Sequence, residues 1–335
     1  MKIIDFKYIA IIAGSLFSSC TADYFTPIVD VVVPKRDPKL VVIADLWSGQ
    51  TDLTIFVTRS RASLDNTPYD YTGVDTILRG PGGGGPGGGG NRTEIVPILI
   101  DTVTGAVVKL SKNGQLLAQL NSVGLGRFRT KLAQPLAEDG ATYTLTISAP
   151  GYTTVESVQK MPSGAVLDSV SYTSDVSVTD PNNPFSRNIR DEYLLDFKDI
   201  INQENYYTAV ALATTKDASG TETIREVPFA SLDPISENNV VSDKDLNGKR
   251  IVWREHSNRR LKGGGRGGNN PAVSGLIQVA LLSITKERYN YIKSYALYQS
   301  TLNNPLAEPV ILYSNINNGY GLFSLGANRV AVARF

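Results

Sequence analysis

Three oxygen-bearing side chains, Asp243, Asp245 and Asn247, stand at alternate positions directly ahead of Gly248. Oxygen ligands at the first, third and fifth places followed by glycine match the front of a calcium-binding loop. The twelfth place is Arg254, where such a loop needs a bidentate carboxylate. Asn-Gly is also a strong turn signal ahead of a strand, so a calcium loop and a plain turn both stay open as interpretations.

Few other residues could support catalysis. The chain has one histidine, His256, and one cysteine, Cys20, so a zinc site with several histidine or cysteine ligands is excluded. Charged neighbours around His256 predict a solvated loop histidine and not a general base. Asp191 and Glu192 are adjacent, and adjacent strand residues point to opposite faces, so they cannot form a matched acid and base. We predict no enzyme, and no cofactor apart from the calcium interpretation.

Cys20 ends an N-terminal pattern that predicts export. Lys2 is followed by the apolar run Tyr8–Phe17 and by two serines. A basic start, about ten apolar residues and small residues before a cut form a secretory signal, too short to span a bilayer. The placement of Cys20 resembles the lipobox of bacterial lipoproteins, in which this cysteine becomes the lipid-bearing N-terminus. We predict a signal peptide over residues 1–19 and lipidation of Cys20, with cleavage and release as the alternative.

The elements after the signal are predicted to be mainly β. Residues 20–37 lack periodicity and hold several prolines, which is typical of an extended tether. Residues 38–160 contain short alternating segments and an Asn113-Gly114 hairpin signal, which together predict an immunoglobulin-like antiparallel β-sandwich. The glycine-rich stretch 80–91 interrupts it and is predicted to be a disordered loop.

Residues 161–335 are predicted to form a second β-rich domain with its own glycine-rich loop, 262–270. A polar loop is expected to end near Arg190. One amphipathic helix follows Thr285, which is a candidate N-cap, and Ile284 is placed to pack on a tyrosine of the first turn.

Three tyrosines of this helix, Tyr291, Tyr295 and Tyr298, share one stripe. Tyrosine stacks on ligands and also hydrogen-bonds to them, so the stripe is a candidate ligand platform. Packing of the stripe against a sheet is the other interpretation.

The charge balance limits the partners. The chain has 33 basic and 32 acidic residues, so no strong field attracts nucleic acid, and we predict no nucleic-acid partner. Without a second cysteine the body depends on its apolar core, for which 41% apolar residues suffice. Its length after residue 19 indicates two domains.

Several stretches in this order resemble one family. They are Pro38–Val42, Gly140–Val155 with Met161-Pro162, Leu167–Val170, Asp243–Lys249, Tyr289–Tyr291 and Asn304–Phe323. The set looks like the Bacteroidota lipoproteins catalogued as the domain of unknown function 4249 family. The resemblance implies a β-rich outer-membrane lipoprotein, commonly encoded beside a TonB-dependent receptor, and it brings no established catalytic residue. The two glycine-rich stretches depart from the family pattern.

Three Asp-Ser/Thr-aliphatic triplets also resemble the O-glycosylation signal of Bacteroidota, and their acceptor residues are Thr76, Thr102 and Ser169. The resulting expectation is a lipid-anchored, surface-facing outer-membrane accessory protein that binds or gates substrate for a TonB-dependent transporter. A structural or adhesive surface lipoprotein is the alternative. A hydrolase comes last, because no nucleophile with a base is identifiable.

Overall fold

The first strands alternate buried residues with more exposed ones. In β1 (Leu40–Trp47) every second residue from Leu40 to Leu46 is apolar and at most 1% exposed. The computed structural model describes residues 37–61, 65, 67–79, 92–180, 183–229, 235–236, 238–257, 261, 274–301 and 306–335. Within it, Pro38–Phe335 form one compact unit, which we describe by itself. The prediction of a mainly β protein is confirmed.

One large sheet takes strands from both ends of this unit, in the order β13-β12-β16-β17-β1-β2-β7-β6-β5-β8-β9, and β14 pairs with β12. Its further strands are β2 (Asp52–Arg59), β5 (Val107–Lys112), β6 (Gln115–Gly124), β7 (Arg127–Lys131), β8 (Thr142–Ser148), β9 (Val155–Lys160), β12 (Tyr206–Lys216), β13 (Glu222–Val227), β14 (Val240–Ser242), β16 (Ser274–Ile284) and β17 (Tyr320–Arg334). A second sheet joins β10 (Val166–Asp180), β11 (Asn183–Lys198) and β15 (Arg250–Ser257). A separate hairpin consists of β3 (Tyr71–Arg79) and β4 (Arg92–Ile100).

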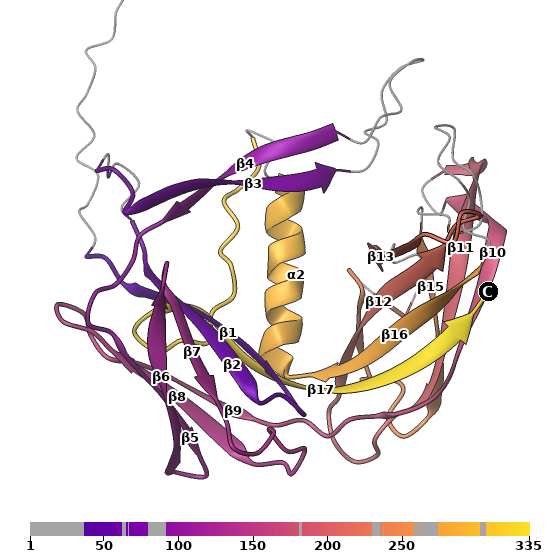
Figure 1. Ribbon diagram of the computed structural model, residues 1–335. Coiled ribbons are helices and arrows are strands. Elements are labelled where there is room, and N and C mark those ends of the chain that lie inside the picture. Colours follow the sequence, from indigo (N-terminus) through magenta and orange to yellow (C-terminus); the bar gives the residue numbers. More distant parts are fainter. Residues whose placement is uncertain are drawn as a thin grey trace, which may run out of the picture. The chain divides into compact units, whose positions relative to one another are not determined.

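β17 joins the two halves of the chain. It pairs in parallel with β1, from Val41 with Tyr320 to Trp47 with Gly326, and antiparallel with β16 over the rest of its length. Figure 1 shows it sweeping from beneath the single labelled helix towards the C-terminus beside β16. The sheet therefore crosses the predicted domain boundary at 160/161, and so does the first of two buried clusters, which includes Met161.

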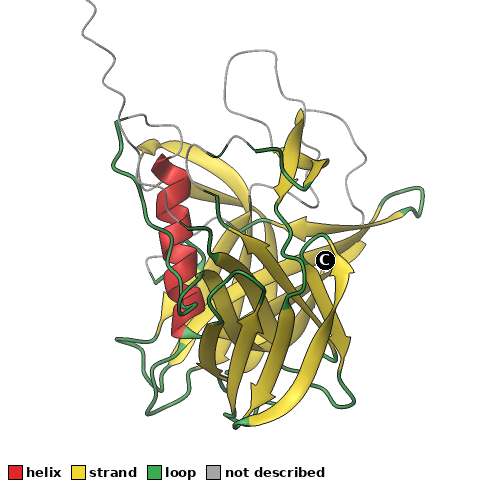
Figure 2. Cartoon of the chain, turned by 90° about the vertical axis from the view of Figure 1, so that its left-hand side faces the viewer, coloured by secondary structure: helices red, strands yellow, loops and turns green. Residues whose placement is uncertain are grey.

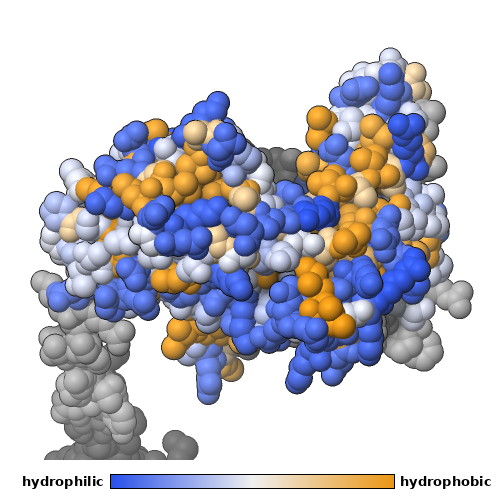
Figure 3. All heavy atoms as spheres, turned by 90° about the horizontal axis from the view of Figure 1, so that it is seen from below, coloured by the Kyte–Doolittle hydropathy of each residue, from blue (hydrophilic) through white to orange (hydrophobic). Residues whose placement is uncertain are grey.

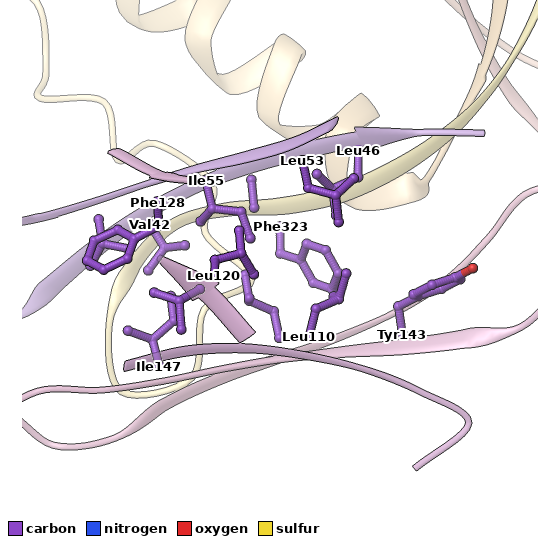
Figure 4. Packing of buried hydrophobic residues seen from close by; sticks show 14 of the residues in the cluster. Val42, Leu46, Leu53, Ile55, Leu110, Leu120, Phe128, Tyr143, Ile147 and Phe323 are labelled. Atoms are coloured by element: carbon purple, nitrogen blue, oxygen red, sulfur yellow. The ribbon is translucent and has the colours of Figure 1, made fainter. Parts of the chain in front are cut away.

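The first cluster fills a β-sandwich in which β1, β2 and β7 face β5 and β8. Figure 4 shows Val42, Ile55, Phe128 and Ile147 pointing into this space, together with Phe323 from β17. Each of these side chains is at most 3% exposed. The immunoglobulin-like connectivity is not confirmed, because a strand from the far end of the chain completes this sandwich.

The second cluster lies between β12, β16 and the smaller sheet. Tyr193 and Phe197 of β11 and Trp253 of β15 meet Tyr207 of β12, and all four are fully buried. The rings of Phe197 and Tyr207 lie edge to face, with centroids 5.0 Å apart. Ala333 of β17 belongs to the same cluster. Residues at odd positions of β17 thus contribute to both cores, and the even positions point to the other face of the sheet.

The helix α2 (Lys286–Thr301) stands on that other face (Figures 1 and 2). We call the face that carries α2 the helix-side face. The helix predicted after Thr285 is confirmed, but a buried stripe on it is wrong, since no residue of α2 is buried. Only its first turns rest on the sheet, through Tyr289 and Ile292. The predicted Thr285 side-chain cap is also wrong: its hydroxyl is buried and makes no hydrogen bond within the described residues.

The remaining predictions concern a loop and the segments outside the described residues. The polar loop expected to end near Arg190 is wrong, because β10 extends to Asp180 and β11 already begins at Asn183. Residues 1–36, including the signal and most of the tether, and the glycine-rich stretches 80–91 and 262–270 lie outside the described residues. No helix in the described part is long and apolar enough to cross a membrane.

Candidate binding surface

The first turn of α2, which we call its foot, is held on the helix-side face by an ion pair and by aromatic packing. Arg288 forms an ion pair with Asp45 of β1 and lies over the Trp47 ring, 5.3 Å from its centre. The Ser324 hydroxyl donates to the other Asp45 oxygen at 2.6 Å. On the opposite side, the rings of Tyr289 and Tyr206 of β12 are 4.6 Å apart. The helix is therefore anchored between β1 and β12.

The stripe of tyrosines lies above this foot. The rings of Tyr291 and Tyr295 are nearly parallel, at 8°, with centroids 6.2 Å apart, and Tyr298 follows at 6.3 Å. Tyr295 is 45% exposed, and partial burial raises the pKa of Tyr291. The interpretation of the stripe as core packing is wrong, and the ligand platform stays a prediction.

Helix geometry gives the direction of this stripe. Tyr291 and Tyr295 follow Arg288 at i+3 and i+7, so they share its side of α2. Because Arg288 reaches Asp45 of β1, this is the side of α2 nearest to β1. Tyr289 and Ile292 lie on the side that packs towards β12 and β16.

Beneath the stripe, the outer surfaces of three strands form one row. Ile43 of β1 pairs with Phe56 of β2, which pairs with Arg127 of β7. Ile43 is 38% and Phe56 43% exposed. β7 carries Arg127, Arg129 and Lys131 on this face, while Phe128 between them points into the core. None of the three cations makes an ion pair with a described residue; Asp52 pairs with Lys131 in the strand register.

On the other side of α2 the helix-side face is partly apolar: Gln278 lies between Leu212 and Val332 in the strand register, and Arg334 lies beside Leu276. Adjacent strands β12, β16 and β17 carry exposed aliphatic side chains in neighbouring rows, and β13 adds one more: Val210, Leu212, Leu276, Val330, Val332 and Ile224. Each is at least 40% exposed. We call this set the apolar strip. Figure 3, a view from below, shows a different surface, where apolar patches alternate with hydrophilic ones.

A small pocket of about 210 Å³ lies at the root of the β3–β4 hairpin. Arg61 makes a two-pronged ion pair with buried Asp101 and lies over the Tyr69 ring, 3.6 Å from its centre. Hydrogen bonds from Arg61 hold the pKa of Asp101 below its ordinary value. These groups already bind one another, so they hold the root of the hairpin close to the end of β2.

The predicted calcium residues lie in a tight turn next to a polar pocket of about 480 Å³. Asn205 donates to one Asp243 oxygen at 3.1 Å, and the Asn202 amide donates to Asn247 Oδ1 at 3.0 Å. Asp245 is exposed, and burial raises the pKa of Asp243. In the described part no three histidine, cysteine, aspartate or glutamate side chains are grouped to hold a metal ion. The geometry therefore favours the turn.

His256 differs from its prediction as a solvated loop residue. It is 5% exposed and lies in β15, where register with β11 places it against Glu192, with 3.4 Å between Nε2 and Oε2. Burial lowers its pKa. The opposite facing of Asp191 and Glu192 is confirmed, because Asp191 is buried on the other side and accepts from Tyr172.

The predicted modification sites are dispersed. Thr76 lies in β3, where the side chains are outside the described part. Thr102 donates its hydroxyl to Asp70 at 3.1 Å, whereas Ser169 is exposed in β10. Cys20 lies outside the described residues. Thr102 and Ser169, which the structure describes, lie on other elements than the tyrosine stripe. The three cations of β7 were missed, although the alternation Arg-Phe-Arg-Thr-Lys was visible in the sequence.

Two sandwiches on a shared sheet, with one helix standing on the helix-side face, define a β-rich protein. The chain belongs to the family described as Domain of unknown function (DUF4249), whose model matches residues 26–330. Comparisons with curated proteins and with solved structures gave no match.

Proposed function

We propose that this protein is a lipid-anchored accessory subunit of the outer membrane that docks on a TonB-dependent transporter and binds or gates its substrate. The N-terminal pattern ending at Cys20 supports the anchor, because a lipid on the N-terminus holds a protein at a membrane surface. The resemblance of the chain to lipoproteins encoded beside such receptors supports the partner.

The observation that carries the proposal is the apolar strip. Large contiguous apolar patches are uncommon on monomeric surfaces and mark interaction sites. The strip lies on a rigid sheet whose other face is buried in the second cluster, so it is presented without rearrangement. α2 borders the strip and gives a docked partner a fixed orientation.

Co-purification after mild detergent extraction tests this proposal. The informative variant is Leu212→Lys with Val332→Lys, which places two charges in the strip. The control is Val158→Lys with Val252→Lys, which changes two exposed valines on the layers that cover the opposite face. We expect the wild type and the control to bring down a TonB-dependent receptor, identified by mass spectrometry, and the strip variant to lose it.

Recovery of the protein alone in every sample contradicts the proposal. Unchanged solute uptake after deletion, together with altered attachment of cells, points instead to the structural or adhesive role.

A further inference from the structure

A row of cations and a wall of tyrosines border the same stretch of β2. Arg127, Arg129 and Lys131 point outwards from β7, and α2 with Tyr291 and Tyr295 rises over β1. Adjacent strands are about 4.8 Å apart, so β1 and β7 are separated by about 10 Å. The outer surface of β2, with Thr54 and exposed Phe56, lies between them, and we call it the β2 surface.

The β2 surface and the cation row of β7 together carry positive charge. Asp45 of β1 is already paired with Arg288. Asp52 is the one acidic residue opposite the row, in register with Lys131. Arg127 and Arg129 face Phe56 and Thr54, which are uncharged. An arginine offers a planar set of donors that binds a carboxylate in two-pronged fashion.

The spacing of the row identifies the form of the ligand. Alternate residues of a strand lie about 6.7 Å apart, and alternate side chains of an extended peptide have the same spacing. An extended chain with carboxylates at every second position therefore matches the cations of β7 one to one. Its other side chains would lie against Phe56 and the tyrosine rings, which provide an apolar and aromatic surface.

We propose that the β2 surface beside β7 binds an extended acidic peptide segment, with alternate carboxylates on Arg127, Arg129 and Lys131. This inference goes beyond the proposed function and does not need a transporter. Binding is measured on the isolated protein, so its failure and the failure of receptor co-purification are separate results.

The test measures fluorescence anisotropy of a fluorescein-labelled peptide of four Glu-Thr repeats with the detergent-solubilised full chain. The variant is Arg127→Gln with Arg129→Gln. The control is Lys109→Gln with Lys160→Gln, which removes the same charge from exposed positions of β5 and β9. We expect the Kd to rise about tenfold in the β7 variant and to stay within twofold in the control. Binding weakens as salt rises from 20 to 300 mM, because exposed charges are screened.

Further probes test the register and the class of ligand. A peptide with four consecutive glutamates followed by four threonines is expected to bind several-fold more weakly, and Tyr295→Ser to weaken the alternating peptide. Equal binding by the β7 variant and wild type overturns the proposal, as does equal binding of a Lys-Thr repeat. Tighter binding of polygalacturonate or of phosphatidylglycerol vesicles than of the acidic peptide also overturns it, in favour of an anionic glycan or a lipid surface.

Discussion

Replacement of Phe323 by alanine tests whether the two sandwiches unfold together. Phe323 is fully buried in the first cluster but lies on β17, which also contributes Ala333 to the second. Loss of a buried phenylalanine costs about 3–5 kcal/mol. Because β17 cannot leave one core without disturbing the other, we expect the second cluster to lose the same stability.

The two tryptophans of the chain make this measurable. Trp253 is buried in the second cluster, so a Trp47→Phe background leaves it as the reporter. In urea, with an m-value of about 3 kcal/mol/M, Phe323→Ala shifts the Trp253 midpoint down by about 1–1.7 M. The control Leu116→Ala, at a position that is 61% exposed, shifts it by less than about 0.2 M.

This reasoning is refuted if Phe323→Ala leaves the urea midpoint of the Trp253 fluorescence unchanged while the midpoint seen by circular dichroism shifts. The halves would then unfold as independent domains.

Three further predictions follow from single contacts. The hydrogen bond from Arg329 lowers the pKa of Glu138 below its ordinary value, so Glu138→Gln is expected to lower the free energy of unfolding by about 1–3 kcal/mol at pH 7. In urea titrations at several pH values, this difference from wild type disappears as the pH falls through the folded-state pKa of Glu138. A difference that stays constant down to pH 3 contradicts this. Gly326→Ala places a Cβ 2.1 Å from the Trp47 ring, so we expect a loss of about 1–3 kcal/mol and an altered near-ultraviolet dichroism; an unchanged spectrum speaks against this packing. Calcium at 1 mM leaves the Tm unchanged, and a rise that Asp243→Asn abolishes supports the calcium loop instead.

Local patterns predicted most of the strands. β8 and β12 have clear signals, because alternate residues face a core and the others face solvent or a second layer. The Asn113-Gly114 turn also occurs as predicted, with positive φ at both residues.

What the sequence could not provide is the pairing of β17 with β1. Parallel pairing between segments almost a whole chain apart leaves no local signal, so two separate domains were the natural prediction. The helix was misjudged for a related reason. Its tyrosines do share one side, but apolar and polar residues are hardly separated around the helix, and α2 has a sheet only under its first turns.

The candidate surface was predicted only in part. The tyrosines were identified from their spacing on the helix. Their relation to Phe56 and Arg127 needs the position of α2 on the sheet, which Arg288 and Asp45 fix through a contact between distant parts of the chain. Similarly, His256 was assigned to a loop because its neighbours are charged, while cross-strand register decided its burial.

The late position of β17 in the chain has a consequence for biogenesis. Residues near the N-terminus cannot close their hydrophobic interior until Phe323 and Leu325 have been synthesised, since these side chains are part of it. Folding during synthesis is therefore postponed, and contacts so distant in sequence form slowly. For the export proposed above, this delay keeps the chain in the unfolded form that a translocation channel requires.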